Sequence, residues 1–188
     1  MHYVAVGAQC VIGVVFIASS VGKVAGRRAF PSFLASLDGT RLLPPSLVRP
    51  AALSVVAAEF GVWVLLAAHR QATVATGFAL AAVLLTVFAL GIALVLVRGL
   101  RTPCRCFGRS TSPLGLRHVV RNVGLAALAL LGAATLRTGP VPPEGLAVAV
   151  CSGLMLGGLV AVLDDILDLF LPVNVSRTRT AASGSKKI

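Results

Sequence analysis

Charged residues are scarce in this chain of 188 residues, at 12%, and acidic residues are the scarcest of them, with six Asp and Glu against seventeen Lys and Arg. Soluble domains carry about 25% charged and about 45–50% apolar residues. Here 57% of the residues are hydrophobic and the mean hydropathy is +0.94, which excludes an ordinary soluble domain. Aromatic residues make up only 5%, and no cluster of them marks a quinone site. The composition indicates a membrane protein.

Two further features are missing from the sequence. It has no internal repeat and no glycine-rich loop that could cradle a phosphate. The net charge of +11 would suggest nucleic acid in a soluble protein. In a membrane protein, however, basic residues act first as topology signals. We therefore expect a lipid bilayer as the environment, no nucleic-acid partner and no cofactor.

Five apolar stretches are present, near residues 3–22, 50–68, 72–97, 119–136 and 146–168. A helical span needs about 20 apolar residues. The first stretch comes before the first basic residue, Lys23, so it lacks the positive region of a signal peptide and is expected to be a retained span. We predict an all-α, polytopic membrane helix bundle of four core transmembrane helices plus a fifth. It forms one domain over residues 1–171, and a disordered tail follows over 172–188.

The basic residues are distributed asymmetrically about these stretches. Fifteen of the seventeen lie in the first loop, around the third loop or in the tail, and only Arg70 and Arg137 lie on the other side. Short loops rich in Lys and Arg stay in the cytoplasm. We therefore predict a multi-pass protein of the bacterial cell membrane, with its N-terminus outside and its tail in the cytoplasm. The first loop, 24–49, mixes apolar and basic residues, which fits either a short helix in the membrane interface or a solvated loop.

Two of the four cysteines form the sequence Cys104-Arg105-Cys106 between the third and fourth stretches. A disulfide between them would close a very small, strained ring, which suits thiol–disulfide exchange better than structural cross-linking. Arg101, Arg105 and Arg109 bring positive charge near the sulfurs and favour the thiolate form. We predict a thiol–disulfide redox site at this pair. His118, at the head of the fourth stretch, is a candidate base, although an interfacial histidine is often simply solvated.

Other interpretations of the cysteine pair remain open. Two thiolates can also hold a thiophilic ion such as Cu(I), which predicts a metal transporter or chaperone with Cys104 and Cys106 as ligands. Structural zinc needs four ligands, and the loop offers only His118 in addition. The third alternative is a non-catalytic membrane scaffold with incidental cysteines.

The motif Pro-Cys-Arg-Cys-Phe-Gly at 103–108, followed by His118, Arg121 and Asn122, resembles the MauE family within the DoxX-like membrane proteins. Lys23, the pair Pro44 and Pro45, and Glu59 also match the pattern of that group. The resemblance implies a helical bundle that works beside a thioredoxin-like partner in maturation of a disulfide-rich protein, the methylamine dehydrogenase small subunit in the founding case. Arg105 departs from the small residue usual between the cysteines. The founding substrate lies outside the cytoplasm, whereas the charge asymmetry puts this pair inside.

Acidic residues within the apolar stretches are further candidates. Glu59 lies ten residues into the second stretch, near mid-membrane, where an ionisable group is a functional candidate and often a proton carrier. The alternative is a protonated Glu59 that only joins helices. Asp164, Asp165 and Asp168 lie near the C-terminal end of the fifth stretch and need cations there. We expect a structural ion network with Arg101, Arg109 and Arg121, and a metal or substrate site is the alternative.

The remaining thiols, Cys10 and Cys151, both fall near the outer ends of their stretches. If the first and fifth stretches were neighbours, the two could pair and relay reducing equivalents across the bilayer. Cysteine in an apolar helix is more often a small hydrophobe. Gly153 and Gly157 are four residues apart, a spacing that lets membrane helices approach closely and that predicts packing within the chain.

Overall fold

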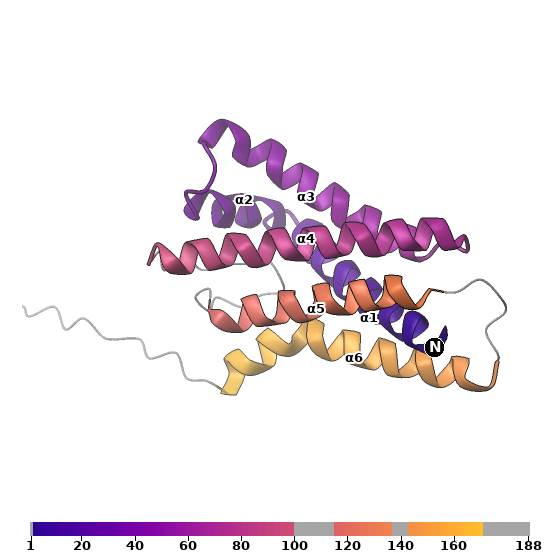
Figure 1. The fold of residues 1–188 in the computed structure, drawn as a ribbon. Helices are drawn as coiled ribbons and strands as arrows, with labels where there is room; N and C mark the ends of the chain where they lie inside the picture. The colour runs from indigo at the N-terminus through magenta and orange to yellow at the C-terminus, as the bar shows by residue number, and fades with distance from the viewer. Residues whose placement is uncertain (1, 100–114, 137–142, 171–188) are drawn as a thin grey trace, which may run out of the picture.

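The computed structural model describes residues 2–99, 115–136 and 143–170, and within these segments it contains six α-helices and no strand (Figure 1). Five of the six are long and apolar enough to cross a membrane, and only α2 is not. The prediction of an all-α, multi-pass membrane bundle is confirmed. The helices are α1 (His2–Val24), α2 (Ala29–Gly39), α3 (Pro45–Leu66), α4 (Gln71–Val97), α5 (Leu116–Thr135) and α6 (Pro143–Phe170).

The long helices alternate in direction, so α1, α4 and α6 end at the same end of the bundle, where α3 and α5 begin (Figure 1). We call this the basic end. Helix α1 packs against α3, α5 and α6, and α4 packs against α3 and α5. This arrangement brings the first and the last predicted spans together, although more than a hundred residues separate them.

Close approach of α1 and α6 depends on two glycines of α6. A Cβ on Gly153 would lie 2.7 Å from the Cβ of Cys10 and 2.7 Å from the carbonyl oxygen of Gly7. A Cβ on Gly157 would lie 3.0 Å from the Cβ of Val14. Both gaps are too small for a side chain, so the two backbones meet directly. The predicted use of this small-residue spacing for packing within the chain is confirmed.

The second span differs from the sequence expectation in its start. It begins at Pro45 and not at Pro50, and Pro50 lies inside α3. Pro44 is extended, with φ −63° and ψ 148°, and Pro45 follows it in the first turn, where the missing N–H group costs nothing. The predicted span takes Pro50 as its first residue because proline is favourable at the first position of a helix.

The loop between the first two spans contains a helix, α2, so the helical interpretation of residues 24–49 is confirmed over Ala29–Gly39. Phe33 of α2 is buried with Ala52 and Val56 of α3 in a small apolar cluster, which we call the α2 cluster. This cluster is separate from the main core, which α1, α3, α4 and α5 form together.

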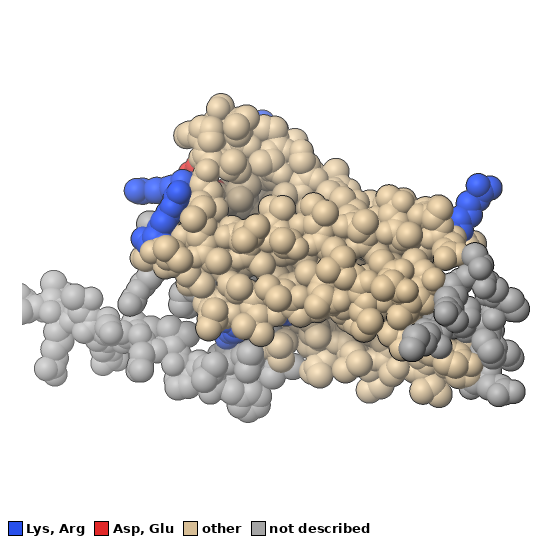
Figure 2. All heavy atoms as spheres, viewed as in Figure 1, with Lys and Arg blue, Asp and Glu red and all other residues tan. Residues whose placement is uncertain are grey.

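Polar and apolar burial are segregated along the bundle. The main core is apolar, whereas the buried polar residues belong to α1, α3 and the first two turns of α5, with Thr40 just after α2. In Figure 2 most of the middle of the visible face is free of charge, and Lys and Arg lie mainly at its two ends, with a further small area at the lower edge. This face is therefore largely apolar, as a surface in contact with lipid must be, and the buried polar side chains lie toward the basic end. The buried polar side chains are Ser19, Ser20, Lys23, Thr40, Glu59, His118 and Asn122.

Candidate functional site

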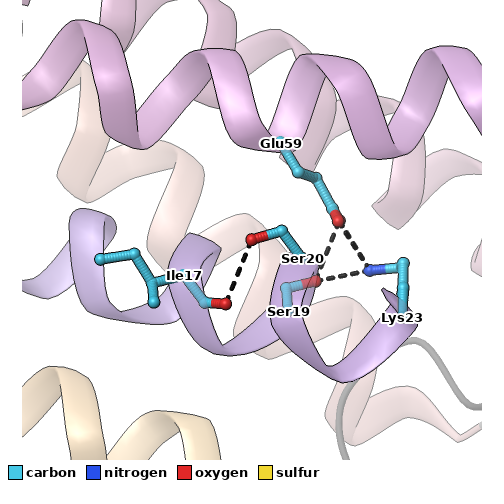
Figure 3. A network of polar contacts seen from close by, with 5 residues as sticks. All are labelled: Ile17, Ser19, Ser20, Lys23 and Glu59. Atoms are coloured by element: carbon cyan, nitrogen blue, oxygen red, sulfur yellow. Dashed lines mark hydrogen bonds and ion pairs between the residues drawn. The ribbon is translucent and has the colours of Figure 1, made fainter. Parts of the chain in front are cut away.

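A salt bridge lies inside the bundle, between Lys23 of α1 and Glu59 of α3 (Figure 3). The Lys23 Nζ donates to Glu59 Oε1 at 2.7 Å and to Oε2 at 2.9 Å. Ser19 Oγ donates to the same Oε1 at 2.9 Å and also accepts a hydrogen bond from Lys23 Nζ. The Lys23 and Glu59 side chains are only 1% and 0% exposed. We call Ser19, Lys23 and Glu59 the ion-pair cluster.

Local sequence positions each member of this cluster. Ser19 and Lys23 are four residues apart on α1 and therefore lie on the same face of the helix. Lys23 is in the last turn of α1, where the helix dipole favours a positive charge. Glu59 lies fourteen residues after Pro45, so it is about 21 Å along α3.

The short helix α2 adds an aromatic wall to the cluster. The Lys23 Nζ lies 5.3 Å from the centroid of the Phe33 ring, a cation–π distance. Phe33 itself is 4% exposed and anchors α2 on α3. The ammonium group is therefore held between a carboxylate, a hydroxyl and an aromatic face, and none of the three is open to water.

The two charges of this pair compensate each other inside the bundle. Burying two charges costs several kcal/mol per ion, and the attraction between them repays this only with good geometry and further hydrogen bonds. The Ser19 hydroxyl and both Glu59 oxygens meet that condition. The pair as a whole is neutral, so a single proton added or removed changes its charge by one unit in a low-dielectric setting.

A second polar group lies at the start of α5, on the same end of the bundle as the end of α1. His118 and Asn122 are buried, 8% and 2% exposed, so His118 is not the solvated interfacial histidine of the alternative interpretation. The Asn122 Nδ2 donates to the His118 carbonyl oxygen at 2.9 Å. Its Oδ1 is buried without a hydrogen-bond partner in the part of the chain that the structure describes. Arg121 lies between these two positions and is half-buried.

The predicted redox residues Cys104, Arg105 and Cys106 lie outside the described residues, as do Arg101 and Arg109. In sequence they follow the end of α4 and precede α5, so their segment joins the bundle at the basic end. The three acids predicted to form an ion network are within the helical range of α6, but their side chains lie outside the description. They are Asp164, Asp165 and Asp168.

The two remaining thiols are both free, and their helices are neighbours, as the relay hypothesis required. The Cβ of Cys10 faces Gly153 of α6, while Cys151 is exposed. Residues two apart on a helix point in nearly opposite directions, so Cys151 is turned away from the helix face that Gly153 presents to Cys10. Within the described residues, no group of three metal-ligating side chains lies together.

The sequence pattern points to Glu59 as a candidate residue but not to its partner in the ion pair. Lys23 counts among the topology signals and among the residues of the family resemblance, and no prediction concerns Ser19. The available signal was the scarcity of acids: Glu59 is the only Asp or Glu in the first three predicted spans, and a charge buried at that depth needs a cation. Lys23 is the basic residue at the end of the neighbouring span, with Ser19 one turn before it.

Comparison with known families gives one match. The family described as Methylamine utilisation protein MauE matches residues 1–135 of the chain, which is well over half of it. The matched segment includes all of α1 to α5, and with them the ion-pair cluster and the Cys104–Cys106 segment. No curated protein and no solved structure matches the chain.

Proposed function

Because this chain belongs to the MauE family of methylamine utilisation proteins, we propose that it is a membrane thiol–disulfide redox protein in which Cys104 and Cys106 exchange electrons with a thioredoxin-like partner. Its place in the membrane follows from five helices that are long and apolar enough to span a bilayer. Its substrate at the end of the exchange would be a disulfide-containing protein of the methylamine dehydrogenase kind.

One observation carries the proposal. In sequence the Cys-x-Cys pair lies between the end of α4 and the start of α5, the helix that begins with buried His118 and Asn122. A pair with one residue between the thiols forms a strained and easily reduced disulfide. Arginines at 101, 105 and 109 favour the thiolate, which is the attacking species.

The exchange balances without another reactant. One cysteine thiolate attacks the disulfide of the partner and forms a mixed disulfide, and the partner's other sulfur leaves as a thiolate. The second cysteine then attacks the mixed disulfide. The partner gains two electrons and two protons and becomes a dithiol, while Cys104 and Cys106 lose two thiol protons and become a disulfide. The reverse sequence reduces the pair.

Thiol chemistry of this kind moves protons, and the ion-pair cluster supports a role in that movement. Glu59 is buried with its charge balanced by Lys23 of the last turn of α1, and intramembrane carboxylates are commonly proton carriers. In this proposal Glu59 takes up or gives a proton as the pair changes redox state, while Lys23 and Ser19 hold its carboxylate in place.

The test is a trapping experiment in native membranes. Cys104→Ser leaves Cys106 able to form a mixed disulfide that the missing thiol cannot resolve, and Cys106→Ser does the converse. We expect each single variant to accumulate a covalent complex with a thioredoxin-like protein, visible on non-reducing gels and lost on reduction. The Cys104→Ser/Cys106→Ser double variant is the matched control and should give no complex.

The same variants address the metal alternative. Absence of any mixed disulfide at every redox poise, together with loss of stoichiometric Cu(I) binding in each single variant, would contradict the redox proposal and favour metal handling. Cys151→Ser, which removes an exposed thiol outside the pair, checks that trapping is specific.

A further inference from the structure

A short peripheral helix, α2, lies beside the ion-pair cluster. Helix α2 packs on α1 and α3, and its buried residue Phe33 forms the α2 cluster with Ala52 and Val56 of α3, apart from the main core. The ring of Phe33, a residue of α2, lies over the Lys23 ammonium group, with 5.3 Å between the Nζ atom and the ring centroid. The buried residues of the main core come from α1, α3, α4 and α5, and none of them belongs to α2.

The chain on each side of α2 turns sharply. Gly26 precedes the helix with φ 104°, a conformation that side chains other than glycine rarely adopt. Arg41 follows the helix with φ 52°, which is uncommon for a residue with a Cβ. At the N-terminal end of α2, Arg28 makes no side-chain cap bond, whereas at the C-terminal end the Thr40 hydroxyl donates to the Leu37 carbonyl oxygen at 2.7 Å. The helix is thus a short unit between two turns.

We propose that α2 is a cover that opens while the spanning helices stay packed, and that Phe33 is the seal that controls water access to the Lys23–Glu59 pair. The proposal rests on the proposed proton role of Glu59 for its purpose, because a carboxylate that exchanges protons must at some stage meet water or another donor. Its physical basis is separate: peripheral elements with few buried contacts open at lower free energy than the core.

The lysine content of the chain supplies a direct reporter. Lysine occurs only at 23, 186 and 187. A small water-soluble acetylating reagent, sulfo-NHS acetate, applied to the full-length protein in lipid nanodiscs, can therefore be followed at Lys23 by mass spectrometry. Lys186 and Lys187 report reagent reactivity in the same sample. We expect Lys23 to be acetylated slowly but to completion in the folded wild-type protein.

The seal is tested by truncating the ring. Phe33→Ala should raise the rate of Lys23 acetylation by at least about tenfold. Loss of a buried phenylalanine should destabilise the closed state by more than the free energy that corresponds to a tenfold change in its population. Phe88→Ala is the matched control, since Phe88 is a half-buried residue of α4 outside the α2 cluster. It should leave the rate within about twofold of wild type.

Hydrogen exchange on the unmodified protein gives a second measurement that does not depend on a variant. Amides of α2 should exchange well before those of Ala52–Leu66 in α3. Three outcomes would overturn the proposal: equal exchange in the two segments, no acetylation of Lys23 short of unfolding, or an unchanged rate in Phe33→Ala. None of these readouts involves Cys104 or Cys106, so failure of the cover and failure of the redox proposal are distinguishable.

Discussion

At the scale of single residues, the most consequential feature is the pairing of one acid with one base inside the membrane domain. Glu59 has two hydrogen bonds from Lys23 and one from Ser19, and all three side chains are buried. Each charge is tolerated only because the other is present. The pair therefore joins α1 to α3 and constrains any chemistry that changes its protonation.

The energetic dependence of the two charges on each other can be measured. Lys23→Met removes the cation and leaves an uncompensated buried carboxylate, which should lower the free energy of unfolding by about 3–5 kcal/mol. The Lys23→Met/Glu59→Gln double variant removes both charges and should recover a large part of that loss. Unfolding of the purified protein in mixed micelles by sodium dodecyl sulfate would give both values.

Arg49→Met is the control for the loss of a positive side chain as such. Arg49 is exposed on α3, so its replacement should change the free energy of unfolding by less than about 0.5 kcal/mol. A Lys23→Met variant as mild as Arg49→Met, or a double variant worse than the single one, would mean that the pair is not mutually dependent.

Sequence alone identified Glu59 as an intramembrane acid because depth in an apolar run can be counted along the chain. Its partner could not be identified in the same way. Whether Lys23 meets Glu59 depends on α1 and α3 being neighbours at a particular height, and helical periodicity does not determine which helices are neighbours. The buried state of His118 has the same origin, since a position at the head of a span fits both an interfacial and a buried side chain.

At the scale of helices, the contact between α1 and α6 is the closest backbone approach among the described glycines that face another helix backbone. A Cβ at Gly153 would meet the carbonyl oxygen of Gly7 at 2.7 Å, and backbone cannot move aside as a flexible side chain can. The glycine spacing predicted this use in outline. The sequence does not identify which helix packs against these glycines, because a stripe of small residues fits any helix with a matching groove.

A matched pair of substitutions on α6 tests this contact. Gly153→Ala should force α1 and α6 apart and lower the free energy of unfolding by about 1–3 kcal/mol, the usual cost of overpacking. Gly158→Ala, five residues further along the same helix, adds its methyl group where nothing lies within 4 Å. It should be neutral or stabilising by up to about 1 kcal/mol, because alanine has the higher helix propensity.

Thermal unfolding in detergent and the same denaturant titration would measure both variants. The comparison holds helix propensity constant, since both changes replace glycine by alanine in one helix. Equal stabilities for Gly153→Ala and Gly158→Ala would show that α1 and α6 do not approach closely in the bilayer.

At the scale of the whole molecule, the number of spans and their order could be predicted because each span is a long apolar run with a clear start and end. The first residue of a span is harder to predict where two prolines could each begin the helix, as Pro45 and Pro50 could in α3. Helix α2 was one of two interpretations of its loop, because its apolar residues serve equally well for a helix or for scattered contacts. Its docking on α3 depends on packing that a sequence pattern does not specify.

Orientation in the membrane is a property of the whole chain, and the length of α4 determines which parts of the chain face opposite sides of the bilayer. Helix α4 has 27 residues, a length of about 40 Å, so the turn before it and the cysteine segment after it must face opposite sides of a bilayer. Arg70 is the N-cap residue of α4, at the end with few basic residues. The charge asymmetry then predicts the cysteine segment inside and the α3–α4 turn outside.

A membrane-impermeant maleimide applied to intact cells measures this orientation. In a background of Cys10→Ala and Cys151→Ala, only Cys104 and Cys106 can react, and after reduction we expect them to be labelled only once the cells are permeabilised. His69→Cys in a fully cysteine-free variant is the positive control, because His69 is exposed in the α3–α4 turn and should react from outside. Labelling of the pair but not of His69→Cys in intact cells would reverse the topology. The cysteine pair would then face the side on which the founding family's substrate is found, and the basic end would be an exception to the rule that positive loops stay in the cytoplasm.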